Sequence, residues 1–451
     1  VDYIANAWNP GIYFSNFNPI ISSKRRFKHE YLISVPDNIL ALSDLEGQSA
    51  DYVMQKIPFQ DFEQTFYYIT HHRAHAANAF YTSPFSEAAI FTADSQGELE
   101  STTFGCANRN SFTISKKIEH PHSLGAFYSA FTEYLGFRPH SDEWKVMALA
   151  AYSDREYIKY YKLLLNNVIS IMEDGTFQLD LSYFCDYLFD RPNLYTDKLV
   201  KLLGPSRRSD DTLETRHYQI AAALQQLVEE VVFNALSVLH KETGSKNIVL
   251  AGGLFMNSLM NGKISTMTPF DNVYIPSCPD DSGNSIGAAL FLYHNILENG
   301  PIAAPNHMYL GPEFSNDEIE TAISQAGLKS KKIKNIEHVT AELLADGALV
   351  GWFQDRMEMG QRALGNRSIL ADPRDASMKD RINQAIKFRE GFRPFAPAIL
   401  KERIADYFEV DVQTEVPYME KIFSINPDRR VEIPAVTHED GTGRVQTVSK
   451  E

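Results

Sequence analysis

The sequence predicts an α/β protein built from two domains. Three observations support this prediction: a length of 451 residues, repeated strand–turn–helix patterns whose turns hold Gly or Asp, and a loss of periodicity at residues 299–306. At roughly 150 residues per domain, a chain of this length is expected to form more than one domain. Residues 299–306, NGPIAAPN, contain two prolines and are typical of a linker. We therefore expect a first domain at residues 1–305 and a second at residues 306–451.

The first strand–helix pattern lies between residues 66 and 105. Residues 66–70, FYYIT, form a short β-rich run, and residues 71–80, HHRAHAANAF, form an Ala-rich helical stretch. Residues 87–105 contain two β-like runs about a polar turn that holds Gly. The expected order is strand, helix, hairpin.

Further helices and strands follow in the same domain. Apolar positions that recur every three or four residues predict helices at residues 123–137, 143–152 and 216–241. NIVLAGG (247–253) is a buried-strand pattern that ends in a Gly pair, and NVYIPS (272–277) repeats it before an apolar helix at 287–297. Ligands collect at the carboxyl ends of such strands, so the turns at 251–253 and 279–284 are candidate sites.

Composition and charge exclude several classes of protein. Lys and Arg number 43 against 58 Asp and Glu, and the resulting net charge of −15 disfavours nucleic acid as a partner. The three cysteines are far apart and form no CxxC pair, which favours a reducing cytoplasm over a disulfide framework or a zinc ribbon. The N-terminus has neither the basic nor the apolar region of a signal peptide, and no stretch approaches the length of an apolar membrane helix. We expect a folded cytoplasmic protein without a membrane partner.

The sequence HHRAH at residues 71–75 is a candidate metal site. In a helix, His71 and His75 stand at i and i+4 on one face, a spacing that lets two imidazoles bind one metal, while His72 points elsewhere. Capping or packing explains an isolated pair of histidines about equally well. Asp281, after a predicted strand, is the best candidate for a third ligand, because a carboxylate beside two imidazoles leaves positions open for substrate oxygens. A helix N-cap is the alternative role for Asp281.

Two turns carry further candidate residues. Asp94, in ADSQGE, precedes the turn between two β-like runs, where a type I turn without any function also explains it. After the buried strand, Gly252 and Gly253 allow the backbone to approach a ligand, while Asn257 and Asn261 share one helical face. Amides in this position can bond a ribose or a base edge, although a tight turn followed by surface asparagines fits as well.

The second domain contains a local basic segment. From Arg356 to Arg393 the chain has nine Lys and Arg against five Asp and Glu, in contrast to its overall acidity. Guanidinium groups bind phosphoryl and carboxyl oxygens in bidentate fashion, so the segment suits a phosphate-bearing ligand. A solvated charged surface is the alternative, but the apolar residues and prolines within the segment disfavour a simple exposed helix.

Taken together, these segments resemble one family. HHRAHAANAF, the Asp94 turn, KVMALAAY, AGGLFMNSLMNGK, DSGNSIGAAL and above all the block from Gly351 to Leu400 are similar to the O-carbamoyltransferases of natural-product and nodulation-factor biosynthesis. The resemblance implies an N-terminal ATPase-like domain of the actin/Hsp70/sugar-kinase superfold and a C-terminal YrdC-like α/β domain. It also implies two steps: carbamoyl phosphate and ATP give carbamoyl-adenylate and pyrophosphate, and the carbamoyl group is then transferred to a substrate hydroxyl.

The resemblance also assigns roles to residues. It implies that His71, His75 and Asp281 bind a divalent metal, Fe(II) in the family. Asp94 is the expected catalytic residue, and Mg²⁺ is a further expected ion. The residues expected to bind ATP and carbamoyl phosphate are Gly252, Gly253, Asn257, Asn261, Arg356, Arg362, Lys387, Arg389 and Arg393.

The chain departs from the family pattern at several points. The opening strand and a loop bearing Asp and His are not found before residue 60, and the chain stops before the segment that completes the YrdC-like site, so both ends look trimmed. Ser95 stands where a Gly is usual.

The expected function is ATP-dependent O-carbamoyl transfer to a small-molecule hydroxyl, on a sugar, macrolide or alkaloid. The alternatives are carbamoylation of a macromolecule, such as a tRNA or a maturation factor, and an inactive nucleotide-binding scaffold. The aromatic stretch at residues 180–195 could stack on a sugar, although core packing explains it more simply.

Overall fold

The computed structural model describes residues 1–9, 51–109, 111–185, 187, 192–300, 302–303, 307–387 and 390–449. The chain divides into two compact units, Val1–Ala304 (unit 1) and Pro305–Glu451 (unit 2). Both units combine helices and strands, so the predicted α/β class is confirmed.

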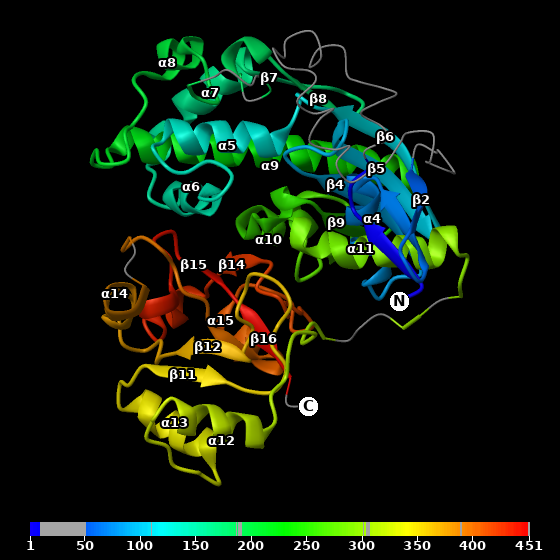
Figure 1. Cartoon of the computed structure of the whole chain (residues 1–451). Coiled ribbons are helices and arrows are strands. Elements are labelled where there is room, and N and C mark those ends of the chain that lie inside the picture. The colour runs from blue at the N-terminus through cyan, green and yellow to red at the C-terminus, as the bar shows by residue number, and fades with distance from the viewer. Residues whose placement is uncertain are drawn as a thin grey trace. The chain divides into compact units, whose positions relative to one another are not determined.

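Unit 1 contains a mixed five-stranded sheet (Figure 1). Its strands, in spatial order, are β10 (Asn272–Tyr274), β9 (Asn247–Ala251), β4 (Glu87–Ala93), β5 (Glu100–Asn108) and β6 (Ser111–Glu119). β10, β9 and β4 are parallel to one another, whereas β5 and β6 continue the sheet as antiparallel strands. The hairpin expected at residues 87–105 is therefore confirmed. The carboxyl ends of β4, β9 and β10 reach the same edge of the sheet, where ligands are expected to bind.

A second, three-stranded sheet leads into the first helix of the site. β1 (Tyr3–Asn6) is parallel to β3 (Glu63–Ile69), and β2 (Tyr52–Pro58) pairs antiparallel with β3 on its other side. β3 leads into α4 (His71–Tyr81), which confirms the predicted strand and helix. β1 and β2 were not expected from the sequence, because a four-residue strand and a half-exposed one carry little periodicity.

Helices α4 and α11 (Asn284–Phe291) pack closely against each other (Figure 1). Their contact depends on small residues: a Cβ added to Gly287 would lie 1.9 Å from the carbonyl oxygen of Ala74. Nearly all of α4 is buried, and it shares an apolar core with strand and helix residues of unit 1, such as Val249 and Phe291. The alanines of α4 thus let its backbone approach both the sheet and α11.

The remaining elements of unit 1 are α5 (Leu124–Tyr134), α6 (Glu143–Ala150), α7 (Ile158–Asn167), β7 (Ile169–Ile171), β8 (Phe177–Leu179), α8 (Asp197–Leu203), α9 (Thr215–Thr243) and α10 (Ser258–Met267). α5, α6 and α9 confirm the three helices predicted from apolar spacing. Among the described residues, α9 is the one helix long and apolar enough to cross a membrane. However, 72% of its most apolar stretch is buried, as in a core helix.

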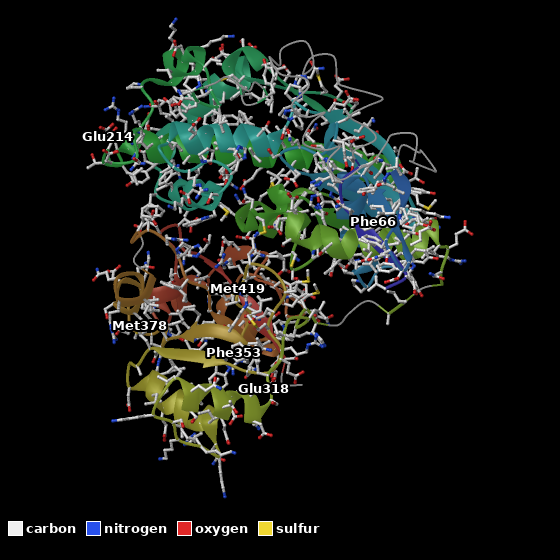
Figure 2. The ribbon with its side chains drawn as sticks, viewed as in Figure 1. Phe66, Glu214, Glu318, Phe353, Met378 and Met419 are labelled. Atoms are coloured by element: carbon white, nitrogen blue, oxygen red, sulfur yellow. The ribbon has the colours of Figure 1, made fainter. Side chains whose placement is uncertain are left out.

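Unit 2 consists of short elements. They are α12 (Asn316–Gln325), α13 (Ile336–Ala345), β11 (Val350–Phe353), β12 (Arg367–Leu370), α14 (Met378–Ile382), β13 (Ala398–Leu400), α15 (Ile404–Tyr407), β14 (Ile422–Ser424), β15 (Thr442–Arg444) and β16 (Gln446–Val448). The described strands form three pairs: β11 with β12, β14 with β15, and β13 with β16. One apolar cluster surrounds Ile404 and Phe408, and another surrounds Met378 of α14. Figure 2 labels Met378 among the side chains of unit 2.

Candidate metal centre

Four side chains of unit 1 meet at the carboxyl edge of the sheet. His71 and His75 lie one turn apart on α4, Asp94 directly follows β4, and Asp281 lies in the turn between β10 and α11. The i, i+4 spacing of the histidines places both rings on one face of α4, as predicted. The two aspartates belong to segments far apart in the sequence. They meet here because β4 and β10 end at the same edge of the sheet.

The ligand atoms of these four residues all lie within 4.8 Å of one another. His71 Nε2 is 3.1 Å from His75 Nε2, and Asp94 Oδ2 is 3.3 Å and 2.9 Å from these two nitrogens. Asp281 Oδ1 lies 3.2 Å from His71 Nε2 and 3.3 Å from His75 Nε2. Donors about 2.1 Å from a tetrahedral cation are separated by about 3.4 Å, so the spacing fits a metal ion with little rearrangement.

Burial and charge distinguish the four groups. The side chain of His75 is fully buried and that of Asp94 is 13% exposed, whereas that of Asp281 is 73% exposed. Burial raises the pKa of Asp94, but hydrogen bonds from His71 and His75 outweigh it and hold this pKa well below its usual range. Burial lowers the pKa of His71, yet the bonds to Asp281 and Asp94 raise it to about 10. Without a cation the two carboxylates hold a proton on this imidazole, and a metal ion would take the place of that proton.

The orientation of Asp94 follows from its own turn. Its Oδ1 accepts a hydrogen bond of 2.6 Å from the backbone N–H of Ser95, which leaves Oδ2 facing the histidines. Such a bond orients a ligating carboxylate. Asp94 is thus a fourth candidate ligand, whereas the sequence suggested a catalytic role.

The neighbouring histidine lies outside the centre. The ring of His72 bonds through Nδ1 to the Thr92 hydroxyl at 2.7 Å and through Nε2 to the Glu100 carbonyl at 3.1 Å. Burial lowers the pKa of His72 well below its ordinary value, so this ring is neutral. This confirms that His72 points away from the pair.

Two polar residues beside the centre were missed from the sequence. The amide of Asn284, at the start of α11, lies 3.4 Å from His71 Nδ1 and 3.3 Å from His75 Nε2. The carboxylate of Glu98, 4% exposed, accepts hydrogen bonds from the backbone N–H of His71. Both residues lie in segments already singled out, DSGNSIGAAL and ADSQGE, but neither contact follows from spacing along the chain.

The Gly252–Gly253 turn lies against the metal centre. Gly252 has a φ of +102°, and a Cβ added to it would lie 2.1 Å from the Ala93 carbonyl oxygen. Its backbone N–H donates to the carbonyl of Pro279 at 2.6 Å, and a Cβ on Gly253 would lie 3.0 Å from Asp94 Oδ1. The turns after β4, β9 and β10 therefore touch one another, and only glycine fits at the point of contact.

The two asparagines after this turn make internal hydrogen bonds. Asn257 exchanges amide hydrogen bonds with Gln225 of α9 and accepts one from the backbone N–H of Met260. Asn261 is 1% exposed and donates to the carbonyl of Phe255 at 2.7 Å. Both side-chain amides thus stabilise the start of α10, which follows the glycine turn in the chain.

Comparison with known proteins identifies the family. A family model described as "Carbamoyltransferase N-terminus" matches residues 27–290, and one described as "Carbamoyltransferase C-terminus" matches residues 341–451. Together they match well over half of the chain. The chain belongs to the carbamoyltransferase family. The family resemblance inferred from the sequence motifs is therefore confirmed.

Several curated proteins are similar to this carbamoyltransferase-family chain. Protein sll1178 of Synechocystis is 40% identical over 408 residues, 84% of this chain and 66% of that protein. Nodulation protein NolNO of Sinorhizobium fredii and nodulation protein NolO of Bradyrhizobium diazoefficiens are each 34% identical over 390 residues, 85% of this chain. The chain spans 55% of the length of NolNO and 68% of that of NolO. A crystal structure of full-length HypF in the phosphate- and nucleotide-bound form matches 54% of this chain and 45% of that chain, with 13% identity and a TM-score of 0.30.

The basic segment lies in the region matched by the C-terminal family model. Its described arginines bond to separate parts of unit 2: Arg356 Nε donates to the Gly311 carbonyl, and Arg362 Nη1 donates to the Tyr418 carbonyl, both at 3.1 Å. Arg393 lies 3.9 Å from the carboxylate of Glu390. Arg389 and the side chain of Lys387 lie outside the described residues.

A buried carboxylate organises the loop of this segment. Glu358 accepts hydrogen bonds from the backbone N–H groups of Leu364 and Asn366, both at 2.7 Å, and of Arg367 at 3.2 Å. Arg367 Nε adds an ion pair of 3.1 Å. Glu358 thus holds the loop around Arg362 in one shape, a role that the count of charges along the segment did not reveal.

The aromatic stretch at residues 180–195 packs into unit 1. Tyr183, Phe184, Tyr187 and Tyr195 are each 9% exposed or less. The core-packing alternative is confirmed for these four residues, while 186 and 188–191 lie outside the described residues.

Proposed function

We propose that this chain catalyses ATP-dependent O-carbamoyl transfer to the hydroxyl group of a small molecule. The observation that carries the proposal is the convergence of two histidines and two aspartates beside a glycine turn, in a chain of the carbamoyltransferase family. In the first step, carbamoyl phosphate and water give carbamate and phosphate, and a carbamate oxygen displaces pyrophosphate from the α-phosphorus of ATP. In the second step, the acceptor oxygen bonds to the carbamoyl carbon, and AMP and a proton leave.

We assign the transfer step to unit 1. His71, His75, Asp94 and Asp281 hold a divalent cation, with Fe(II) as the expected ion, and the Gly252–Gly253 turn receives the adenine nucleotide. When bound, the cation supplies Lewis-acid polarisation of a carbonyl or phosphoryl oxygen. At Gly253 an added Cβ would meet only the Asp94 side chain, so the missing Cβ leaves room for a phosphate group to approach the backbone beside Asp94. The resemblance to the O-carbamoyltransferases implies an actin/Hsp70/sugar-kinase superfold, and we propose that fold for unit 1.

Adenylate formation is assigned to unit 2, for which we propose a YrdC-like fold. Arg356, Arg362, Lys387, Arg389 and Arg393 are the residues proposed to neutralise the phosphates of ATP and carbamoyl phosphate. Crowded phosphoryl oxygens need cationic donors held in place before the reaction. The hydrogen bonds that Glu358 accepts from the backbone of Leu364 and Asn366 support this, because they fix the loop in which Arg362 lies.

We propose a small-molecule hydroxyl as the acceptor, of the sugar or oligosaccharide type in the first instance. The relatives named as nodulation proteins support this choice through the resemblance to enzymes of nodulation-factor biosynthesis. A screen of oligosaccharide, aminoglycoside and macrolide acceptors should find a gain of one carbamoyl mass. A gain on tRNA or protein alone would contradict the choice of acceptor and leave the carbamoyl chemistry in place.

The first experiment tests the adenylation step. The chain is incubated with carbamoyl phosphate and ATP, and the exchange of labelled pyrophosphate into ATP is followed. We expect exchange that depends on carbamoyl phosphate. If exchange is absent, or equal without carbamoyl phosphate, the proposed reaction is wrong.

The second experiment separates the two units. Arg362→Ala should slow pyrophosphate exchange at least tenfold, since loss of a positioned charge at a phosphate costs about 1.4 kcal/mol or more. The same variant should still transfer the carbamoyl group from pre-made carbamoyl-adenylate. Arg374→Ala is the matched control, because Arg374 pairs with Asp372 on an exposed turn of the same segment. The reverse pattern would contradict the assignment of adenylation to unit 2.

A third experiment addresses the metal. Asp281→Asn should lower the metal content of the purified chain, measured by elemental analysis, and should slow carbamoyl transfer. Asp280→Asn removes the neighbouring carboxylate, which lies outside the group of four. Equal metal content in Asp281→Asn, Asp280→Asn and the unaltered chain would refute the assignment of Asp281.

A further inference from the structure

The first turn of α4 carries the ligand His71 but has no cap of its own. The residue that precedes the helix, Thr70, makes no side-chain hydrogen bond to it, and the first turn contains no acidic residue. The first backbone N–H groups of a helix have no partner within the helix, so they need one from elsewhere. The side-chain partner comes from a loop 27 residues further along the chain.

Glu98, in the loop between β4 and β5, supplies that partner. Both of its carboxylate oxygens lie 3.1 Å from the backbone nitrogen of His71. The residue is 4% exposed, so the contact is shielded from water. A carboxylate at this position also interacts favourably with the positive end of the helix dipole.

We propose that Glu98 is a positioning residue of the metal centre: by capping α4 from a separate loop, it holds His71 Nε2 where a cation can bind it. This inference rests on the metal site of the proposed function. Ligand distances in metal sites are held to within about 0.2 Å, so small shifts in the first turn of α4 matter.

The loop that carries Glu98 packs directly against the two adjacent histidines. A Cβ added to Gly97 would lie 2.9 Å from His72 Cδ2 and 3.3 Å from His71 Cβ. The backbone N–H of Gly97 donates to the carbonyl of Glu100 at 2.6 Å, which closes the loop beneath Glu98. The carboxylate therefore reaches the helix from a tightly packed turn that leaves it little freedom to move away.

Glu98 also joins the N-terminal segment to the metal centre. Its Oε1 accepts a second hydrogen bond, of 2.6 Å, from the backbone N–H of Asn9. The preceding residue, Trp8, places its ring edge-on to the ring of His71, with centroids 5.7 Å apart. One carboxylate thus ties together three segments, residues 8–9, the start of α4, and the β4–β5 loop.

The test measures metal affinity in the full chain, with Co²⁺ as the probe in competition with a chromophoric chelator. Glu98→Ala should weaken Co²⁺ binding 10- to 100-fold, the range found when partners of metal ligands are removed. Glu98→Gln keeps the shape and one acceptor oxygen, so it should recover part of that loss. The matched control is Glu100→Gln, two residues further on at the start of β5, whose carboxylate pairs with Lys117 instead.

Spectra and unfolding curves separate positioning from general stability. The d–d absorption of bound Co²⁺ should change in Glu98→Ala and stay unchanged in Glu100→Gln, because only the first variant releases His71. If Glu98→Ala binds Co²⁺ with the affinity and the spectrum of the unaltered chain, the inference is wrong. If Glu98→Ala does not fold, Glu98→Gln decides by the same comparison.

The outcome is also separable from that of the proposed reaction. A chain that binds Co²⁺ in a Glu98-dependent way but shows no pyrophosphate exchange would contradict the proposed reaction and support the role of Glu98. Failure of the unaltered chain to bind Co²⁺ would overturn both the metal site and this inference.

Discussion

Replacing Gly287 by Ala tests whether the packing of α4 on α11 sets the geometry of the metal centre. The added Cβ would lie 1.9 Å from the carbonyl oxygen of Ala74, 2.7 Å from its carbonyl carbon and 3.1 Å from Asn78 Cβ. Ordinary contacts of this kind are close to 3.5 Å, so the two helices must separate by roughly 1.5 Å. The carbonyl of Ala74 belongs to the hydrogen-bonded backbone of α4, and therefore cannot move aside alone.

This separation should affect stability and metal binding together. Overpacking costs about 1–3 kcal/mol, and contact with a rigid backbone puts Gly287→Ala near the upper end, about 3 kcal/mol of unfolding free energy. Asp281 lies three residues before α11, whereas His71 and His75 lie on α4. A shift of roughly 1.5 Å between these groups far exceeds the tolerance of about 0.2 Å for metal ligands. We therefore expect Co²⁺ binding to weaken by at least about tenfold.

Urea unfolding of the metal-free chain and Co²⁺ titration are the assays. Gly300→Ala is the control, because nothing lies within 4 Å of the position of its Cβ. The opposite result is an unfolding free energy of Gly287→Ala that equals that of the unaltered chain to within about 0.5 kcal/mol, with equal Co²⁺ binding. In that case the close helix contact does not control the site, and the reasoning fails.

Three further predictions concern other parts of the chain. Burial lowers the pKa of His438 to about 4, so the unfolded chain takes up a proton at a higher pH than the folded chain does. Unit 2 should therefore keep its full stability above pH 6.5 and lose about 2 kcal/mol of unfolding free energy between pH 7.5 and pH 5. His438→Gln should flatten this pH dependence in urea unfolding. Glu358→Ala leaves three backbone N–H groups without their partner and should cost about 3 kcal/mol in the same assay, whereas Glu313→Ala, at an exposed position, should cost less than about 0.5 kcal/mol. Adding Co²⁺ at about 100 times its dissociation constant should raise the unfolding free energy of unit 1 by about 2.7 kcal/mol, and chelation should reverse the gain; no rise on addition would argue against a site in the folded state.

Local sequence determined the elements that carry the site. The Ala-rich stretch after a β-rich run predicted α4, and the Gly pair after NIVLA predicted the turn that follows β9. The pairing of His71 with His75 was also predictable, because an i, i+4 spacing places two side chains on one helical face whatever surrounds the helix. These features depend on backbone periodicity and on residues close in the chain.

The tertiary structure decided which other groups join them. Asp94 and Asp281 meet the histidines because β4, β9 and β10 are parallel neighbours, and strand order is set by long-range packing rather than by any motif. Glu98 caps a helix that begins 27 residues earlier. In the sequence, Glu358 is only one acidic residue in a basic segment. In unit 2 its carboxylate is buried and accepts hydrogen bonds from backbone N–H groups. A carboxylate's role depends on the donors that face it after folding, and residue spacing along the chain does not encode those donors.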